Sequence, residues 1–151
     1  EELAARIQER REEEKIAALP INKLKAIRAT IADAPALLDA ADWAGVRTTI
    51  GLAGPSFSKL IKSSGFSDAV TLQALKLTVQ LRKDLLPADT FAYNEQSLFK
   101  SVPGSGYCAP GVVPRDEPGA CKIAPLPDTT PAVAALKAGL ATFDEIIKVC
   151  S

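Results

Sequence analysis

The side chains that most often carry out catalysis or hold metal ions are sparse in this chain. Its 151 residues include no histidine, so there is neither an imidazole base for a serine or cysteine nucleophile nor an imidazole metal ligand. The three cysteines, Cys108, Cys121 and Cys150, form no C-x-x-C pair, which argues against a zinc site. We therefore expect no catalytic residues and no metal or cofactor site.

Acidic side chains and one glycine-rich stretch are the remaining candidates for chemistry. Glu12, Glu13 and Glu14 are consecutive, so on a helix they fan around the axis instead of converging on a metal, and no Glu-x-x-His motif occurs. The Gly-Ser-Gly stretch at 104–106 lies among prolines and lacks the Lys-Ser/Thr that follows a phosphate-binding loop. The glutamates are predicted to be a solvated charge run, and the glycine stretch a turn.

The charge of the chain is balanced as a whole but uneven along it. Eighteen basic and eighteen acidic side chains cancel, so no polycation points to a nucleic-acid partner. Residues 43–83 are cationic, because six basic side chains there are set against Asp68 alone. The lysines expected on the polar sides of helices are Lys59, Lys62, Lys76 and Lys83. They either only keep the protein soluble or form an electrostatic footprint for an acidic partner protein.

Helices must position these groups, because apolar residues recur with a period near 3.6 along most of the chain. Residues 1–20 are mostly charged, with Leu3 and Ile7 as the only large apolar side chains among the first fifteen. This segment is predicted to be a charged helical arm, separate from the main fold. The arm is either solvated or becomes ordered against a partner.

Two bundle helices are expected in the first half of the chain. The first covers residues 21–38, where apolar positions follow steps of three and four and Pro35 introduces a kink. The second begins after Asp42, whose carboxylate can accept backbone N–H groups of the first turn. It continues one apolar face over residues 43–61 and is interrupted by the Gly-Pro pair at 54–55.

A third helix is expected from Ser67, with Pro87 ending it and Asp89 starting a shorter one. Its solvent-exposed side is predicted to carry Gln73, Lys76, Gln80 and Lys83. Its buried side is predicted to be lined by Leu72, Leu75, Val79 and Leu86. The shorter helix carries Phe91, Leu98 and Phe99.

The tract 102–130 holds six prolines and four glycines, a composition that forbids a long helix and predicts an irregular loop. Thr130 and Pro131 then open a last helix as its cap and first residue. Its predicted seam consists of Val133, Leu136, Leu140, Phe143, Ile147 and Cys150. Helices that are apolar on one side only must cover one another, so the predicted fold is all-α, an antiparallel four-helix bundle over residues 21–151.

This arrangement favours one pairing of the cysteines. Cys108 and Cys121 are thirteen residues apart and are tethered at the end of the bundle where the last helix begins. Cys150 ends a helix that rises about 28 Å from Pro131, too far for a disulfide unless the loop runs the length of the bundle. A Cys108–Cys121 disulfide, with Cys150 as a buried thiol, is therefore predicted and would indicate an oxidising compartment. Three free thiols are the alternative.

The segment around the only tryptophan resembles a known protein family. Asp42, Trp43, Val46 and Arg47 match the D-W-x-x-V-R pattern that opens the second helix of PsbQ-like proteins, extrinsic subunits of photosystem II in the thylakoid lumen. The preceding ALLDAA is similar to the end of their first helix, and the cysteine-bearing loop is similar to that of the extra PsbQ-like subunit of diatoms and their relatives. Trp43 is expected to fill the core at the helix junction, and Arg47, one turn on, to lie over its ring.

The resemblance implies a non-enzymatic protein that docks on the photosystem II core and other extrinsic subunits, helps to retain calcium and chloride, and shields the manganese cluster. Those metals belong to the core complex. It also implies a location in the chloroplast thylakoid lumen, peripheral to the membrane, and no apolar run approaches the roughly 20 residues that span a bilayer. Two alternatives remain open: a bundle that binds a lipid or other hydrophobic ligand, and a small secreted inhibitor stabilised by a disulfide.

Overall fold

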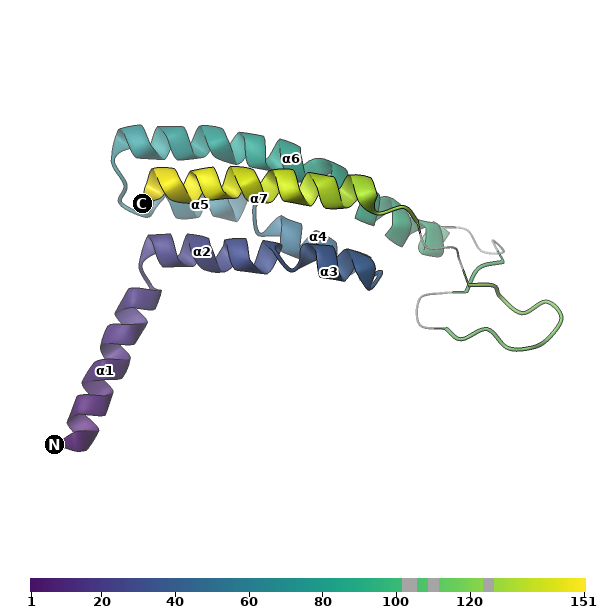
Figure 1. Ribbon diagram of the computed structural model, residues 1–151, viewed down its shortest axis with the longest axis horizontal. Helices are drawn as coiled ribbons and strands as arrows, with labels where there is room; N and C mark the ends of the chain where they lie inside the picture. The colour runs from purple at the N-terminus through teal and green to yellow at the C-terminus, as the bar shows by residue number, and fades with distance from the viewer. Residues whose placement is uncertain (102–105, 109–111, 124–126) are drawn as a thin grey trace.

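The computed structural model describes residues 1–101, 106–108, 112–123 and 127–151, with the backbone alone for residues 97–101. Over these residues every regular element is a helix, which confirms the prediction of an all-α fold (Figure 1). The helices are α1 (Glu2–Ala17), α2 (Pro20–Ile31), α3 (Ala34–Asp39), α4 (Trp43–Gly51), α5 (Pro55–Lys62), α6 (Asp68–Ser101) and α7 (Thr130–Cys150).

The two longest helices, α6 and α7, pack along each other, and α7 returns in the direction opposite to α6 (Figure 1). The buried side of α7 consists of Ala132, Ala135, Leu136, Gly139, Phe143, Ile146 and Cys150. Half-buried beside it, although predicted in the same seam, are Val133, Leu140 and Ile147. Phe143 meets Phe57 of α5 with ring centroids 5.2 Å apart, so the core extends from α7 to the shorter helices.

Residues that cannot continue a helix divide each of the first two expected helices into two pieces. α2 and α3 are separated at residues 32–33, and Pro35 lies in the first turn of α3, where its missing N–H costs no helical hydrogen bond. α4 and α5 are separated at residues 52–54, and Pro55 opens α5 in the same way. Both breaks lie where the sequence predicts a kink or an interruption.

α6 runs without a break through Pro87, so the prediction that this helix ends there and restarts at Asp89 was wrong. A proline inside a helix removes one backbone hydrogen bond and crowds the preceding turn, at a cost of about 3 kcal/mol. Pro87 is exposed, so water can reach the carbonyl group that loses its partner. Burial of Leu85, Ala88 and Ala92 on the opposite side offsets the cost. The side chains of Leu98 and Phe99 lie outside the described residues.

The buried side of α6 also differs from the prediction. Leu72, Val79 and Leu86 are 57%, 52% and 59% exposed, and only Leu75 of the four predicted residues packs, half-buried, against the core. The side that packs into the core consists of Ala74, Thr78, Leu81, Leu85, Ala88 and Ala92. These positions follow steps of four and three, as in a bundle seam, but half of them are alanine and one is threonine. Sequence reasoning that relied on large apolar residues therefore chose the wrong side.

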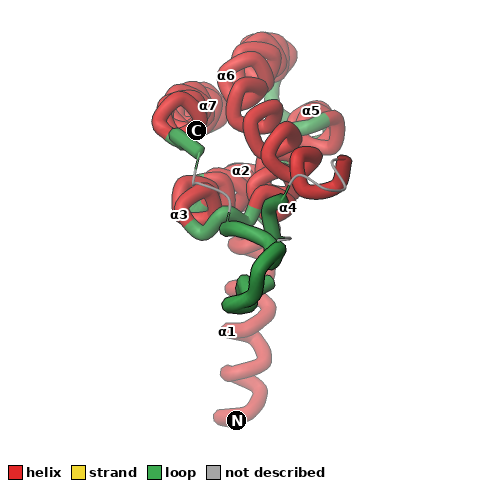
Figure 2. The backbone as a smooth tube through the Cα atoms, turned by 90° about the vertical axis from the view of Figure 1, so that its right-hand side faces the viewer, coloured by secondary structure: helices red, strands yellow, loops and turns green. Residues whose placement is uncertain are grey.

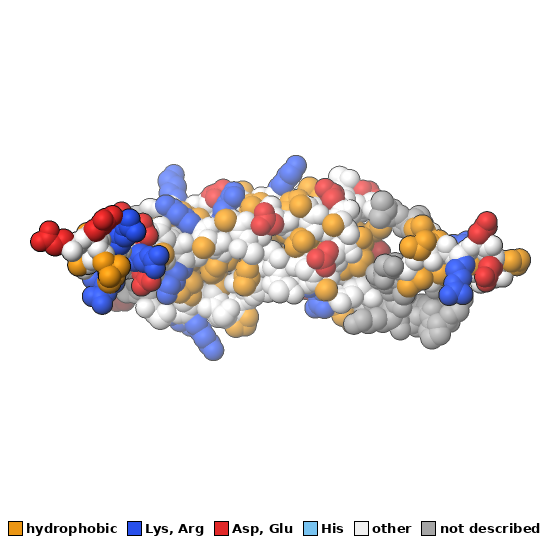
Figure 3. Space-filling view, turned by 90° about the horizontal axis from the view of Figure 1, so that it is seen from below, with side chains coloured by type: hydrophobic (Ala, Val, Ile, Leu, Met, Phe, Trp, Pro, Cys, Tyr) orange, Lys and Arg blue, Asp and Glu red, His pale blue; other side chains and the backbone are white. Residues whose placement is uncertain are grey.

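α1 buries none of its side chains and projects away from the other helices (Figure 2). Its apolar side chains, Leu3, Ile7 and Ile16, are all exposed. Acidic and basic side chains are intermixed over this arm, at the left end of Figure 3. The segment is thus the charged helical arm expected from its composition, and nothing in the described chain covers it.

The segment between α6 and α7 is closed by a disulfide between Cys108 and Cys121, whose Cα atoms are 4.8 Å apart. Two backbone hydrogen bonds support it: Cys108 N–H donates to Lys122 O at 2.8 Å, and Lys122 N–H donates to Gly106 O at 2.7 Å. Cys150 is a free, buried thiol at the other end of α7. Most of the turn expected at 104–106 lies outside the described residues.

The cap of α7 is not the one expected. Thr130 is already helical, and its backbone N–H donates to the carboxylate of Asp128 at 3.0 Å. Hydrogen bonds from the side chain and backbone of Thr130 hold the pKa of Asp128 below its ordinary value. The residue that precedes the helix, Thr129, makes no side-chain cap hydrogen bond, and the carboxylate of Asp128 instead accepts one free N–H of the first turn.

Candidate docking surface

The four residues of the D-W-x-x-V-R pattern meet at the junction between α3 and α4. α3 ends at Asp39, and Ala41 in the following turn adopts a left-handed backbone (φ 55°), so the chain turns sharply before α4. Asp42 then caps α4 by accepting the N–H of Gly45 at 2.9 Å. This cap fixes the first turn of α4 and directs the next residues of the pattern into the core.

Trp43 and Val46 are the core-facing residues of the pattern. Trp43 is 6% exposed, and its ring meets Phe91 of α6 edge-on, with centroids 5.7 Å apart and planes at 77°. Val46, one turn later, is fully buried. The tryptophan therefore packs the junction against the C-terminal half of α6, which is the core-filling use expected of it.

Arg47 lies at the edge of this junction and reaches across to α6. Its Nε donates to Asp89 Oδ1 at 3.2 Å, and its guanidinium carbon lies 4.9 Å from the centre of the Tyr93 ring. The aromatic ring beneath Arg47 is thus Tyr93, and the expectation that Arg47 lies over Trp43 was wrong. Asp89 and Tyr93 are one turn apart on α6, so a single side chain contacts both.

A second arginine ties the turn between α4 and α5 to α6. Arg82 Nε donates to Ala53 O at 3.3 Å, and its Nη2 donates to Gly54 O at 3.1 Å and to Ser58 Oγ at 2.7 Å. Sequence reasoning counted Arg82 only as part of the basic segment. The sequence does not reveal this role, because the break between α4 and α5 is what leaves these carbonyl groups without helical partners and free to accept from Arg82.

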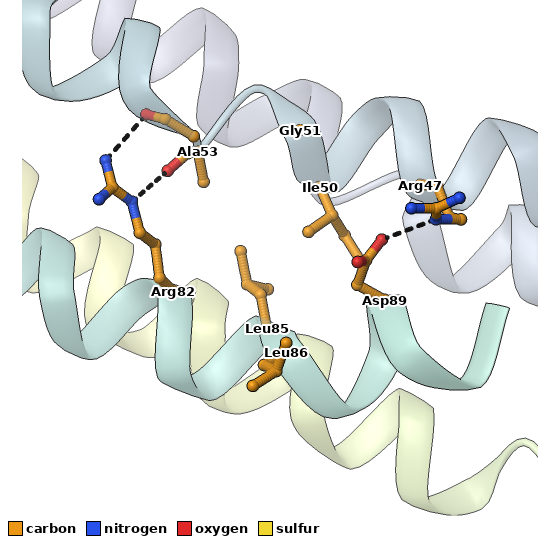
Figure 4. Close-up of a pocket in the computed structure, with 9 residues that line it drawn as sticks. Arg47, Ile50, Gly51, Ala53, Arg82, Leu85, Leu86 and Asp89 are labelled. Carbon is orange, nitrogen blue, oxygen red and sulfur yellow. Dashed lines mark hydrogen bonds and ion pairs between the residues drawn. The ribbon is translucent and has the colours of Figure 1, made fainter. Parts of the chain in front are cut away.

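Between these two arginines lies a shallow groove of about 280 Å³. Figure 4 shows Arg47 and Arg82 at its two ends, with Ile50, Leu85, Leu86 and Asp89 between them. Both guanidinium groups already have partners within the chain. Arg47 is ion-paired with Asp89, whereas among the described residues Arg82 donates only to uncharged oxygens, so the Arg82 end of the groove keeps a positive charge. The exposed Leu86 borders the open side of the groove.

The four lysines singled out from the sequence lie on two neighbouring helices. Lys59 and Lys62 are on α5, and Lys76 and Lys83 are on α6, two turns apart on the exposed side that also carries Gln73 and Gln80. All four are exposed, and none takes part in the ion pairs formed among the described residues. Their charges are thus available to attract an acidic surface.

Neither metal chemistry nor membrane insertion is indicated in the part of the chain that the structure describes. No cluster of acidic or cysteine side chains there could hold a metal ion. No helix within the described ranges is long and apolar enough to cross a membrane. Comparison with protein-family models, with curated proteins and with solved structures found no match to the chain.

Proposed function

We propose that this chain is a non-enzymatic extrinsic subunit of photosystem II that docks on the lumenal side and stabilises the oxygen-evolving complex, helping it to retain calcium and chloride. The observation that carries the proposal is the D-W-x-x-V-R pattern. Asp42 caps α4, Trp43 and Val46 are buried, and Arg47 bridges to α6. Each residue of the pattern has a structural role at the same helix junction, which supports the resemblance more strongly than the sequence match alone.

The arrangement of helices is compatible with the fold that the resemblance implies. We propose that the chain forms an antiparallel four-helix bundle. Its first helix is α2 and α3 together, its second is α4 and α5 together, and the last two are α6 and α7. Each short helix packs against a neighbouring part of the bundle: α3 contacts α4, and both α4 and α5 contact α6. The charged helix α1 buries no side chain and lies outside this bundle.

Docking is assigned to the basic side of α5 and α6. Exposed lysines without ion-pair partners speed the approach to an acidic protein surface more than they tighten the final complex, and their effect is screened by salt. Such a subunit attaches peripherally to the photosystem II core and to other extrinsic subunits. The Cys108–Cys121 disulfide supports a location in an oxidising compartment such as the thylakoid lumen.

The lysines can be tested with a charge-matched control. The docking variant changes Lys59, Lys62, Lys76 and Lys83 to Gln, and the control changes four other exposed lysines, Lys23, Lys25, Lys137 and Lys148. Both lose the same charge. We expect the docking variant to rebind salt-washed photosystem II membranes at least about tenfold more weakly and with a shallower salt dependence than the control. Equal rebinding of the two variants would contradict the assignment of the surface.

A further inference from the structure

A row of exposed apolar side chains runs along the outer side of α6. This outer stripe consists of Leu72, Val79, Leu86 and Tyr93, which are 57%, 52%, 59% and 53% exposed. Its members are seven residues apart, so the stripe extends about 31 Å along the helix. Figure 2 shows that α7 and α5 flank α6 and leave its outer side uncovered. The ring of Tyr93 also meets the guanidinium of Arg47, so the stripe borders α4 at that end. An exposed apolar row of this regularity is uncommon on a soluble protein.

The charges beside the outer stripe have a single sign over most of its length. Lys76 and Lys83 follow Leu72 and Val79 by one turn, and both are exposed. The only carboxylate from residue 72 to residue 86 is that of Asp84. It accepts hydrogen bonds from Gln80 and from Thr142 of α7, and so faces α7. The chemistry of the outer side is therefore apolar along its centre and basic at its border.

The spacing identifies the kind of partner. A row that repeats every seven residues supplies one of the two apolar positions per heptad at which a second helix packs, and Lys76 and Lys83 lie one turn after it. We propose that the outer stripe and its lysines receive an acidic amphipathic helix of a partner protein. This inference deepens the proposed function and rests on it for the identity of the complex that supplies the helix.

Two other occupants fit less well. A second copy that paired through α6 would bring Lys76 and Lys83 of each chain toward the same basic stripe on the other, where like charges repel. A lipid surface favours a broad apolar face, whereas this row is one residue wide. Both alternatives are outcomes of the test below.

The probe is a synthetic helix of about 28 residues, with leucine at the two core positions of each heptad and glutamate at the flanking positions. Its binding to the full chain is followed by fluorescence anisotropy, beside a version with lysine in place of glutamate. The stripe variant changes Leu72, Val79 and Leu86 to Gln. A matched control makes the same number of changes at exposed apolar residues of the arm, Leu3, Ile7 and Ile16. Circular dichroism checks that both variants keep their helices.

The wild-type chain and the arm control should bind the acidic probe equally and bind the lysine version more weakly. The stripe variant should lose at least about tenfold in affinity. Equal binding by the stripe and arm variants, or no binding by the wild type, would overturn the inference. Binding to anionic lipid vesicles in place of the probe would also overturn the inference. So would a wild-type dimer that is lost in the stripe variant. The probe contains no photosystem component, so failed rebinding to photosystem II membranes with intact probe binding would refute the proposed function alone.

Discussion

Leu85 of α6 packs directly against the backbone of α7 at Gly139. A Cβ atom at Gly139 would lie 2.9 Å from Leu85 Cγ and 3.8 Å from a methyl carbon of Leu81. The missing side chain therefore lets the two longest helices approach each other at the centre of the core. The side of α6 that meets α7 here also carries Ala88 and Ala92, so small residues on both helices set their separation.

Replacing Gly139 with Ala should destabilise the protein although alanine is the better helix former. Overpacking of a tight core costs about 1–3 kcal/mol, which exceeds the gain in helix propensity of about 1 kcal/mol. Gly51 is the control, because a Cβ there would meet no atom within 4 Å and Gly51→Ala should be neutral or stabilising. Urea denaturation measures both. A higher midpoint for Gly139→Ala would show that α6 and α7 are not in close contact.

Trp43→Ala should lower the free energy of unfolding by about 3–5 kcal/mol, since it removes a large buried side chain from the junction of α3, α4 and α6. Trp43→Phe keeps an aromatic ring against Phe91 and should cost clearly less. Chemical denaturation followed by far-ultraviolet circular dichroism compares the two variants. An unchanged midpoint for Trp43→Ala would mean that the tryptophan is exposed, and would make it a candidate for direct contact with a partner.

Reduction of the Cys108–Cys121 disulfide should leave the helices intact while making the protein less stable. A disulfide that closes thirteen residues contributes about 3 kcal/mol in the chain-entropy model. We expect the denaturation midpoint to fall after reduction and the helical circular dichroism signal of the native protein to persist. Cys150→Ala controls for the free thiol. Loss of the helical signal on reduction would show that the loop organises the core.

The thiol of Cys150 should react more slowly in the folded protein than in the unfolded chain. Burial at the end of α7 raises its pKa above the ordinary value of 9.0, so less thiolate is present at any given pH than in the unfolded chain. The pKa of Cys150 is higher in the folded protein than in the unfolded chain. Its contribution to the free energy of unfolding is therefore fully present below the unfolded-state pKa and declines as the pH rises toward the folded-state pKa. Alkylation rates with and without urea test this; equal rates in the two conditions would show an accessible thiol.

The sequence predicted most of the helices, because Pro35, the 54–55 pair and Pro131 mark their boundaries and large apolar residues mark most of the buried sides. It failed at α6, where half of the buried seam is alanine while Leu72, Val79 and Leu86 lie outside it. The prediction that the helix ends at Pro87 also failed, because packing on the opposite side of the helix outweighed one lost hydrogen bond. At the candidate surface, the capping role of Asp42 could be predicted from its residue type alone. The partners of Arg47 and Arg82 could not be predicted, since they come from distant parts of the chain.

The most direct test of the central claim is rebinding of the purified chain to photosystem II membranes that have been stripped of their extrinsic subunits. Oxygen evolution is then measured at limiting calcium and chloride. The predicted result is saturable, salt-sensitive binding that restores oxygen evolution under these conditions and has less effect when both ions are abundant. Absence of saturable binding, or binding that leaves oxygen evolution at limiting calcium and chloride unchanged, would contradict the assignment of this chain as an extrinsic subunit of photosystem II.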